Sequence, residues 1–424
     1  MSDVPSAKAV RDARCRARSV FAVAGAVTLG ISVVACSSSG SDTQGGSRGV
    51  DAKSHTITIG MTGPQTGPLA AAYESTYGAI ARLASANNTV NGWKIKYIQL
   101  DDQYQPAQAL ANAQKLVQQN KVFAIVAQGG SPTTAAVLPY AVQAKVLDVA
   151  PVTESGVVLT KYASATNVFA FEPPYAQLAA YDLNYVHKNL PGKYAVAYQS
   201  GSAGAAALAG WQYQGKVLGT SAAATVGAPP SATDFSGYAA RLKDSGAATV
   251  LTWLAPNQLA ALIQASTAVG FKPQWVADWP DLSSAFLKLA GPAGTGMLFG
   301  NWAPPTVNPS AEIAKVVNSI KAATSDKEPS VAAVLGWVGM SVFIEGLTRA
   351  TSGGKVPTAA SFTSALRDCA PFDAGGIGIK VSYCGDKLTP QRDSMYKWDG
   401  DSLTVVSGPE DMPSVPTENL AGKG

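Results

Sequence analysis

The sequence predicts an α/β protein of two lobes, each built on a largely parallel sheet with helices on both faces. The first observation is that short runs rich in β-branched residues alternate with alanine-rich stretches of helical period along most of the chain. The second is that Pro-Pro pairs at residues 173–174 and 304–305 divide this alternation into separate series. A chain of 424 residues is long enough for two domains of ordinary size.

The first series predicts four strands, and the loops after three of them carry polar groups. Strands are expected at 56–60, 94–100, 122–126 and 146–149, and helices at 70–87, 106–117 and 133–144. The loops contain Gly63-Pro64, Gly130-Ser131 and Thr153-Glu154-Ser155. Because ligands of parallel sheets gather at the carboxyl ends of strands, these loops are expected to converge on a binding cleft.

The second series follows the first Pro-Pro pair and repeats the pattern. Strands are expected at 194–198 and 249–254, and helices at 175–188, 205–213, 235–244 and 258–269. Two further helices are expected at 310–323 and 331–350, followed by short strands and turns over 356–406. The Pro- and Gly-containing end, 406–424, is expected to be a loose tail.

The N-terminal region resembles a bacterial lipoprotein leader that ends at Cys36. An apolar stretch at 20–34 has the length of a signal peptide, and Ser and Gly dominate 37–41. The basic residues before it are Lys8, Arg11, Arg14, Arg16 and Arg18. This pattern predicts a signal peptide at 1–35, lipid on Cys36, a flexible tether at 36–55 and anchoring at the outer face of the cell membrane. The alternative is a buried cysteine in a core helix.

Charge and cysteine usage fit an exported protein. Removal of residues 1–35 takes away five basic and two acidic side chains, which lowers the formal charge from +4 to about +1. A nearly neutral chain gives no electrostatic case for nucleic acid binding. Cys369 and Cys384 most simply form a disulfide; a metal pair is the alternative, but neither His55 nor His187 lies near them in sequence.

Enzyme motifs are absent from the sequence, which favours a binding protein over an exported hydrolase. The stretch at 200–204 lacks the first glycine of a Gly-x-Ser-x-Gly nucleophile elbow. Asp101 and Asp102 are adjacent on a strand and therefore point to opposite faces, which disfavours a glycosidase pair. No phosphate-binding loop or dinucleotide fingerprint occurs, so no cofactor is expected.

Four motifs, in order, resemble the type I periplasmic binding proteins, specifically the leucine/isoleucine/valine-binding receptors of ABC transporters. They are Gly60 to Pro64; Asp101-Asp102 followed by Pro106, Ala107 and Ala109; Val126 to Ser131 with Thr133-Thr134; and Gly270-Phe271-Lys272 running to Ala290-Gly291 and Gly296-Met297. The resemblance implies two Rossmann-like lobes joined by three hinge strands, which close over a small ligand. Lobe 1 would hold 56–171 plus 303–370, and lobe 2 would hold 172–302 plus 371–405.

The resemblance also implies ligand-binding residues in lobe 1. Ser131 matches the serine that holds a ligand carboxylate, although Ser131-Pro132 is also a good helix start. Thr153 or Ser155 is expected to assist rather than Glu154, because two carboxylates repel each other. Tyr73 lies near the aromatic residue that covers the pocket, with ordinary packing as the alternative.

Lobe 2 departs from the family pattern. Gly201 to Gly204 stand where amino-acid receptors place a tyrosine, and Trp279 stands where they place the acid that pairs with the ligand ammonium. Unless Asp278, Asp281 or Glu154 substitutes for that acid, a branched-chain amino acid is a doubtful ligand. Trp253 and Trp279 would then offer flat apolar faces to an aromatic or larger carboxylate, with packing in the core as the alternative.

The expected partners follow from the same resemblance. They are a small amino-acid-like or carboxylate ligand, the subunits of an ABC permease and the membrane through the N-terminal lipid, with the chain itself a monomer. A ligand sensor that uses the same two lobes for signalling is the competing function.

Overall fold

The computed structural model describes residues 47–67, 69–154, 156–384 and 392–421. The predicted signal peptide, the lipidated Cys36 and the candidate ligand residue Ser155 lie outside the described residues.

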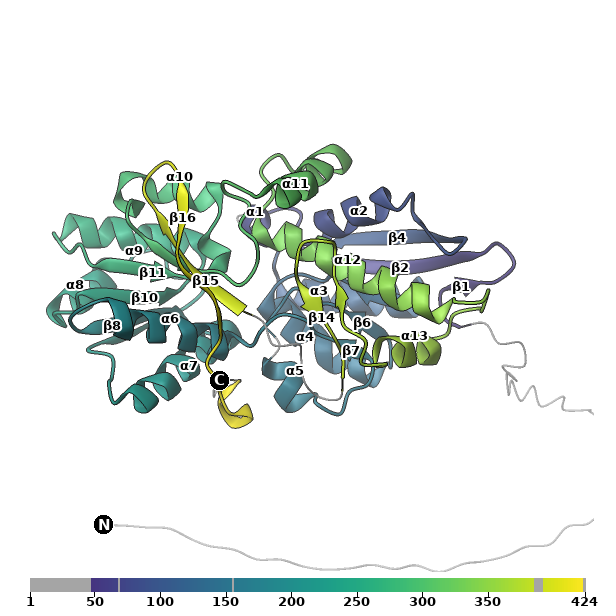
Figure 1. The fold of residues 1–424 in the computed structure, drawn as a ribbon, viewed down its shortest axis with the longest axis horizontal. Helices are drawn as coiled ribbons and strands as arrows, with labels where there is room; N and C mark the ends of the chain where they lie inside the picture. Colours follow the sequence, from purple (N-terminus) through teal and green to yellow (C-terminus); the bar gives the residue numbers. More distant parts are fainter. Residues whose placement is uncertain (1–46, 68, 155, 385–391, 422–424) are drawn as a thin grey trace, which may run out of the picture. The chain divides into compact units, whose positions relative to one another are not determined.

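The first sheet of the described chain has seven strands, in the order β3-β4-β2-β5-β6-β7 with β1 paired to β2 (Figure 1). They are β1 (Val50–Asp51), β2 (Thr56–Gly63), β3 (Thr89–Val90), β4 (Trp93–Asp101), β5 (Ala124–Val126), β6 (Leu147–Val149) and β7 (Val168–Phe169). Strands β4, β2, β5, β6 and β7 pair in parallel, whereas β1 and β3 pair antiparallel to their neighbours. All four strands predicted in the first series are therefore present.

Alternation along β2 explains how helices cover both faces of this sheet. Ile57, Ile59 and Met61 are fully buried in one core. That core also takes residues of α2 (Thr76–Ser85), α12 (Val331–Ala350) and α13 (Ala359–Leu366). Gly60 faces the other way, against Leu116, in the core with α3 (Pro106–Gln114) and α4 (Ser131–Gln143). Because side chains alternate along a strand, β2 contributes residues to a separate apolar core on each face of the sheet.

The second sheet has the order β16-β15-β12-β11-β10-β8-β9 in the described chain. Its strands are β8 (Tyr194–Gln199), β9 (Thr225–Ala228), β10 (Thr249–Trp253), β11 (Gln274–Ala277), β12 (Leu298–Gly300), β15 (Arg392–Trp398) and β16 (Leu403–Asp411). One core contains residues of α6 (Tyr175–Asn189) and α7 (Ser202–Leu218). The opposite core contains residues of α8 (Ser236–Asp244), α9 (Pro256–Ala268) and α10 (Ser284–Ala290).

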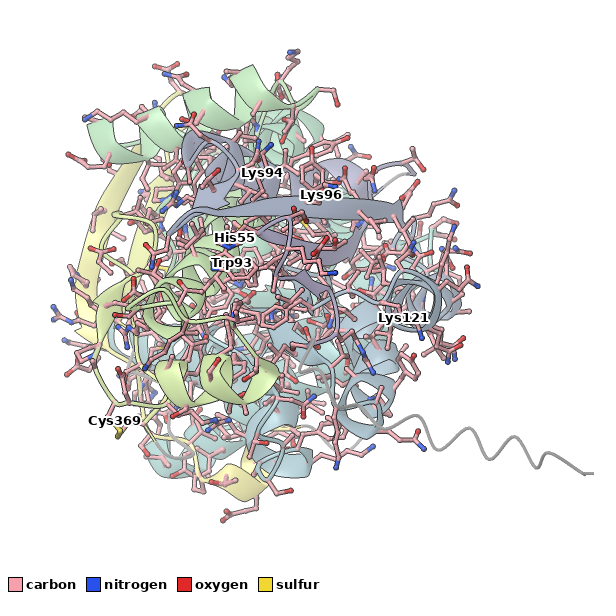
Figure 2. The ribbon with its side chains drawn as sticks, turned by 90° about the vertical axis from the view of Figure 1, so that its right-hand side faces the viewer. His55, Trp93, Lys94, Lys96, Lys121 and Cys369 are labelled. Atoms are coloured by element: carbon pink, nitrogen blue, oxygen red, sulfur yellow. A yellow bond between two sulfur atoms is a disulfide. The ribbon has the colours of Figure 1, made fainter. Side chains whose placement is uncertain are left out.

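The chain passes between the two sheets more than once. After β12 it returns to the first sheet, where α11 (Ala311–Ala323) and α12 pack against α2. The small antiparallel pair β13 (Phe372–Asp373) and β14 (Lys380–Val381) follows, flanked by the disulfide between Cys369 and Cys384 that the sequence predicts (Figure 2 labels Cys369). Strands β15 and β16 then complete the second sheet: β15 pairs antiparallel with β12, and β16 pairs antiparallel with β15. The two-lobed α/β fold is thereby confirmed.

Several predicted elements agree with the structure and others do not. The helix expected at 331–350 is α12; it is long and apolar enough to span a membrane, but it is a core helix here, with most of its side chains buried. The single helix expected at 70–87 is wrong: the chain forms α1 (Ala70–Tyr73) and α2, separated by an extended Glu74. β16 runs across residue 406, where a loose tail is expected to begin. Strands β9 and β11 have no counterpart in the prediction.

Candidate ligand-binding site

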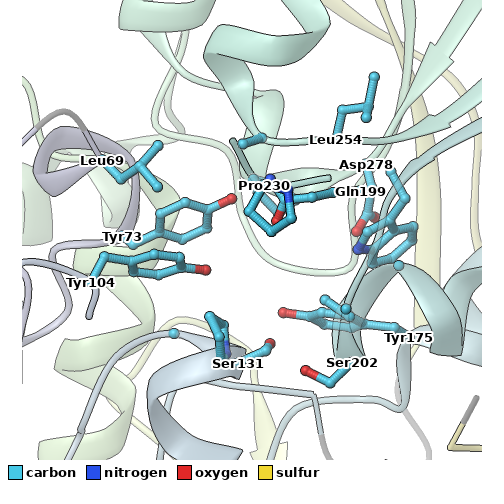
Figure 3. Close-up of a pocket in the computed structure, with 18 of the residues that line it drawn as sticks. Leu69, Tyr73, Tyr104, Ser131, Tyr175, Gln199, Ser202, Pro230, Leu254 and Asp278 are labelled. Carbon is cyan, nitrogen blue, oxygen red and sulfur yellow. The ribbon is translucent and has the colours of Figure 1, made fainter. Parts of the chain in front are cut away.

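A cavity of about 460 Å³ lies at the carboxyl ends of strands from both sheets (Figure 3). The first sheet contributes the segments that follow β2, β4, β5 and β6, and the second contributes those after β8, β10 and β11. The residues that line the cavity include Tyr73, Tyr104, Gly130, Ser131, Tyr175, Gln199, Ser202, Trp253, Asp278, Trp279 and Asp281. The volume suits a small organic molecule, and the position is the one expected for ligands of parallel sheets.

Ser131 is the first residue of α4 and lies in the lining of the cavity. The N-cap of the helix is Gly130, so the serine is not the capping residue. Its hydroxyl faces the phenol of Tyr175 in Figure 3, and a hydrogen bond between the two opposes the rise that burial causes in the tyrosine pKa. A hydroxyl beside the first turn of a 13-residue helix is a favourable seat for a carboxylate oxygen.

Two stacked tyrosines form another wall. The rings of Tyr73 and Tyr104 have centroids 4.6 Å apart at an interplanar angle of 20°. The backbone N–H of Tyr104 donates to Asp102 Oδ1 at 2.9 Å, which fixes the turn that presents the ring. Gly130 has a φ of +97°, and a Cβ there would lie 2.5 Å from Tyr104 Cε2, so only glycine allows the ring this close to the loop.

The two tryptophans predicted as ligand contacts both line the cavity. Trp253 ends β10 and packs against Tyr175 with a centroid distance of 4.8 Å. Trp279 follows Asp278 and is 2% exposed, and its Nε1 atom has no hydrogen-bond partner among the described residues. The cavity therefore has aromatic surfaces on several sides, and the indole N–H is an unused donor.

Asp278 and Asp281 place two carboxyl groups in the lining, in or beside the short helix η2 (Trp279–Asp281). Both are at most 2% exposed, and within the described chain both Asp278 oxygens and Asp281 Oδ1 lack hydrogen-bond partners. Burial raises the pKa of both carboxyl groups well above the ordinary value, and for Asp278 the nearby Asp182 adds to the rise. Of the three acids that could substitute for the family's ammonium-pairing acid, Asp278 and Asp281 therefore line the cavity.

Thr153 and Glu154 are not among the residues that line the cavity, although the neighbouring Val152 is. Thr153 is buried, and its backbone N–H lies beside the carboxyl group of Glu172. Glu154 accepts hydrogen bonds from the N–H groups of Gly156 at 2.6 Å and Val157 at 3.3 Å, at the start of α5 (Gly156–Lys161). Glu154 thus caps a helix and does not replace the missing acid.

Sequence reasoning missed Tyr104 and Tyr175. Both carry a recognisable signal: Tyr104 comes two residues after the Asp pair at the end of β4, and Tyr175 comes directly after the Pro-Pro break between the two series. An aromatic residue at a strand end or at a crossing between lobes is therefore a useful candidate for a cavity wall.

Comparisons with known proteins agree with this architecture. The family model described as periplasmic binding protein matches residues 56–401. A curated relative, the Leu/Ile/Val-binding protein homolog 3 of Brucella melitensis biotype 1, is 26% identical over 351 residues, which cover 81% of this chain and 91% of the relative. Both the family and this relative are described as binding proteins.

Solved structures share the fold at low sequence identity. A solute-binding protein of an ABC transporter from R. palustris, in complex with benzoate, superposes with a TM-score of 0.74 at 18% identity, covering 85% of this chain and 98% of that one. A leucine-binding protein from Thermotoga maritima superposes with a TM-score of 0.70 at 20% identity, covering 83% and 98%. The chain and these proteins have the same two-lobed α/β fold.

Proposed function

Because the chain belongs to the periplasmic binding protein family, we propose that it is the extracytoplasmic receptor of an ABC importer. In this proposal it captures a small amino-acid-like or organic carboxylate ligand in the cavity and delivers it to a permease. The observation that carries the proposal is the cavity itself, which has lining from the strand ends of both sheets and both polar and aromatic walls.

The ligand carboxylate is proposed to lie against Ser131, at the N-terminal turn of α4. The hydroxyl group and the positive end of the helix dipole support this placement. Tyr73, Trp253 and Trp279 are proposed to contact the apolar part of the ligand, and their positions in the lining support that role. Thr153 and Ser155, close in sequence to the cavity-lining Val152, are proposed as alternatives for the same carboxylate seat.

Capture is proposed to involve closure of two lobes, 56–171 with 303–370 and 172–302 with 371–405. Contacts of one ligand with residues of both sheets would stabilise the closed form, which a permease then recognises. A sensor that reports the closed form to a signalling partner is the second candidate, because it would use the same cavity.

Membrane attachment is proposed through lipid on Cys36, after removal of residues 1–35. The basic and apolar leader and the Ser/Gly tract that follows support it. Replacing Cys36 with Ser (C36S) in a bacterial host that processes lipoproteins is expected to abolish incorporation of labelled palmitate and to release the protein from the membrane fraction. Equal labelling of the wild type and the variant would contradict the anchor.

The receptor proposal is tested by a thermal-shift screen of amino acids, aromatic carboxylates and aliphatic carboxylates against the full mature chain. A ligand that binds the native state at a concentration of 100 times its Kd stabilises it by about 2.7 kcal/mol, so at least one compound is expected to raise Tm clearly. Reisolation of that compound unchanged is expected for a receptor, whereas conversion to a product would favour an enzyme. The absence of any shift across the whole panel would contradict the proposal.

A further inference from the structure

The charged side chains that line the cavity are all acidic in the described part of the chain. Asp278 and Asp281 are among the lining residues, whereas no lysine, arginine or histidine is. An anionic ligand would therefore meet no positively charged side chain, while a cationic ligand would meet two carboxyl groups.

These carboxyl groups are arranged to receive hydrogen bonds. Three of their four oxygens, both of Asp278 and Oδ1 of Asp281, are buried without a hydrogen-bond partner among the described residues. Asp278 lies at the cavity wall in Figure 3. A protonated nitrogen carries N–H donors that match unused carboxylate oxygens, and a buried polar group left without such a partner is costly.

More acids lie behind the wall. Asp182 of α6 and Asp393 of β15 both raise the pKa of Asp278 through their charge, and both are buried. Asp182 packs against the backbone of Gly300 at the end of β12, where a Cβ would overlap its carboxyl group. No basic residue is among the largest influences on the pKa of Asp182, Asp278 or Asp393 in the described chain. The wall therefore holds several carboxyl groups that can ionise beside an incoming cation.

The aromatic walls suit the same charge. The rings of Tyr73, Tyr104, Tyr175 and Trp253 surround the cavity, and aromatic faces attract cations. Among the described residues, no group of three or more acidic, histidine or cysteine side chains is placed to hold a metal ion. The chemistry of the wall is therefore that of a seat for an organic cation.

We infer that the cavity selects ligands with a net positive charge and seats a protonated nitrogen between Asp278 and Asp281. This inference rests on the proposed receptor function and specifies the ligand class. A basic amino acid or an amino-acid amide has this charge, whereas a branched-chain amino acid is neutral overall and benzoate is an anion.

Binding of such a ligand is expected to release protons. The groups that face Asp278 are Asp182 and Tyr175 from α6, Asp393 from β15, Asp281 from η2 and Tyr73 from α1, all acidic or phenolic. Without a cation, burial and these neighbours favour the protonated carboxyl group. When the cationic nitrogen binds, the carboxyl group ionises and its proton passes to the buffer. The net charge at the wall is therefore unchanged.

The test is isothermal titration of the full mature chain with compounds matched in size but not in charge. The pairs are L-arginine with L-citrulline, L-lysine with L-norleucine, and L-leucinamide with L-leucine, with 4-methylpentanoate and benzoate as anions. In the pairs that bind, the cationic member is expected to bind at least about tenfold more tightly. Its enthalpy is expected to differ between phosphate and Tris buffers in the direction of proton release.

Two variants locate the seat. Asp278→Asn is expected to remove at least about tenfold of the affinity for the cationic member. The neutral member also carries an α-ammonium group and is expected to lose less affinity, so the preference for the cation shrinks. Asp281→Asn gives a second, independent measurement at the same wall. The control is Asp244→Asn, on the exposed end of α8, which is expected to change neither affinity. A Tm equal to or above that of the wild type verifies that each variant folds.

Tighter binding of the neutral or anionic members, or proton uptake on binding, would overturn the charge selection and leave the receptor proposal standing. Proton uptake would mean that the protonated aspartates donate hydrogen bonds to an anion. Failure of every compound in the wider screen, of any charge, would instead contradict the receptor proposal.

Discussion

Asp101 and Asp102 are neighbours in the chain whose carboxyl groups accept different hydrogen bonds. Asp102, which follows β4, accepts hydrogen bonds from Thr62 and Tyr104, whereas Asp101, the last residue of β4, accepts from Gln65 and Gln103. Both carboxyl groups thus hold the loop after β4, in which Tyr104 lines the cavity. The direction of the Asp278 side chain could not be predicted. It depends on the turn after β11, which residue spacing along the sequence does not determine.

Ser131 provides a prediction at the residue scale. Replacement by alanine removes a hydroxyl group that lines the cavity without distorting α4, whose N-cap is Gly130. A hydrogen bond to a charged group is worth about 1.5–3 kcal/mol, so the affinity for a carboxylate ligand is expected to fall at least about tenfold. Titration calorimetry measures it, with Ser319→Ala on a partly exposed side of α11 as the control. An unchanged Kd for Ser131→Ala would exclude Ser131 as the carboxylate seat.

The break between α1 and α2 shows why element boundaries were the least predictable feature. The alanine-rich pattern of 70–87 continues through the break, but Glu74 is extended and its carboxyl group accepts from the Thr76 hydroxyl at 2.5 Å and the Tyr77 N–H at 3.1 Å. A capping interaction of this kind starts α2 anew. The chain changes direction at this break, and Tyr73, the last residue of α1, lines the cavity.

Close packing of α2 on α12 gives a prediction at the element scale. A Cβ on Gly78 would overlap the carbonyl oxygen of Ala333, so the two helix backbones approach as closely as glycine allows. Gly78→Ala is expected to lower the free energy of unfolding by about 1–3 kcal/mol or more through overpacking. The matched control is Gly237→Ala in α8, where a Cβ meets nothing within 4 Å and a gain of about 0.5–1 kcal/mol is expected. Urea unfolding compares the two, and similar effects would refute the close approach.

At the scale of the whole molecule, the alternation of strands and helices was sufficient to predict two parallel sheets and a cavity at their carboxyl ends. The final strands β15 and β16 were not predictable in detail, because an antiparallel pair at a sheet edge has no connecting helix and its β16 residues are mostly exposed. The buried acids were equally hidden in the sequence. Nothing in the local sequence distinguishes Asp148, Asp182 and Asp393 from exposed aspartates. Only the tertiary structure places them in the interior.

These buried acids predict how stability depends on pH. Burial raises the pKa of Asp393 to about 8, with the Ser394 N–H as a hydrogen-bond donor that opposes the rise, and raises the pKa of Asp148 and Glu154 to about 7. A carboxyl group with a raised pKa in the folded state contributes stability that is fully present below its unfolded pKa, near 4. That contribution is lost as the pH rises through the folded value. The free energy of unfolding is therefore expected to decrease between about pH 5 and pH 8.

Asp393→Asn isolates one of these groups, because the asparagine oxygen still accepts the Ser394 N–H but no longer ionises. Between about pH 5 and pH 8 the wild type is expected to lose about 1.4 kcal/mol per pH unit more than the variant. Urea unfolding at several pH values measures both slopes, and the exposed Asp244→Asn is expected to follow the wild type. Parallel curves for Asp393→Asn and the wild type would mean that Asp393 does not hold its proton in the folded state. In that case a positive charge would have to compensate the Asp393 carboxylate in the folded interior. Three buried aspartates close together, Asp182, Asp278 and Asp393, do not remain ionised without one.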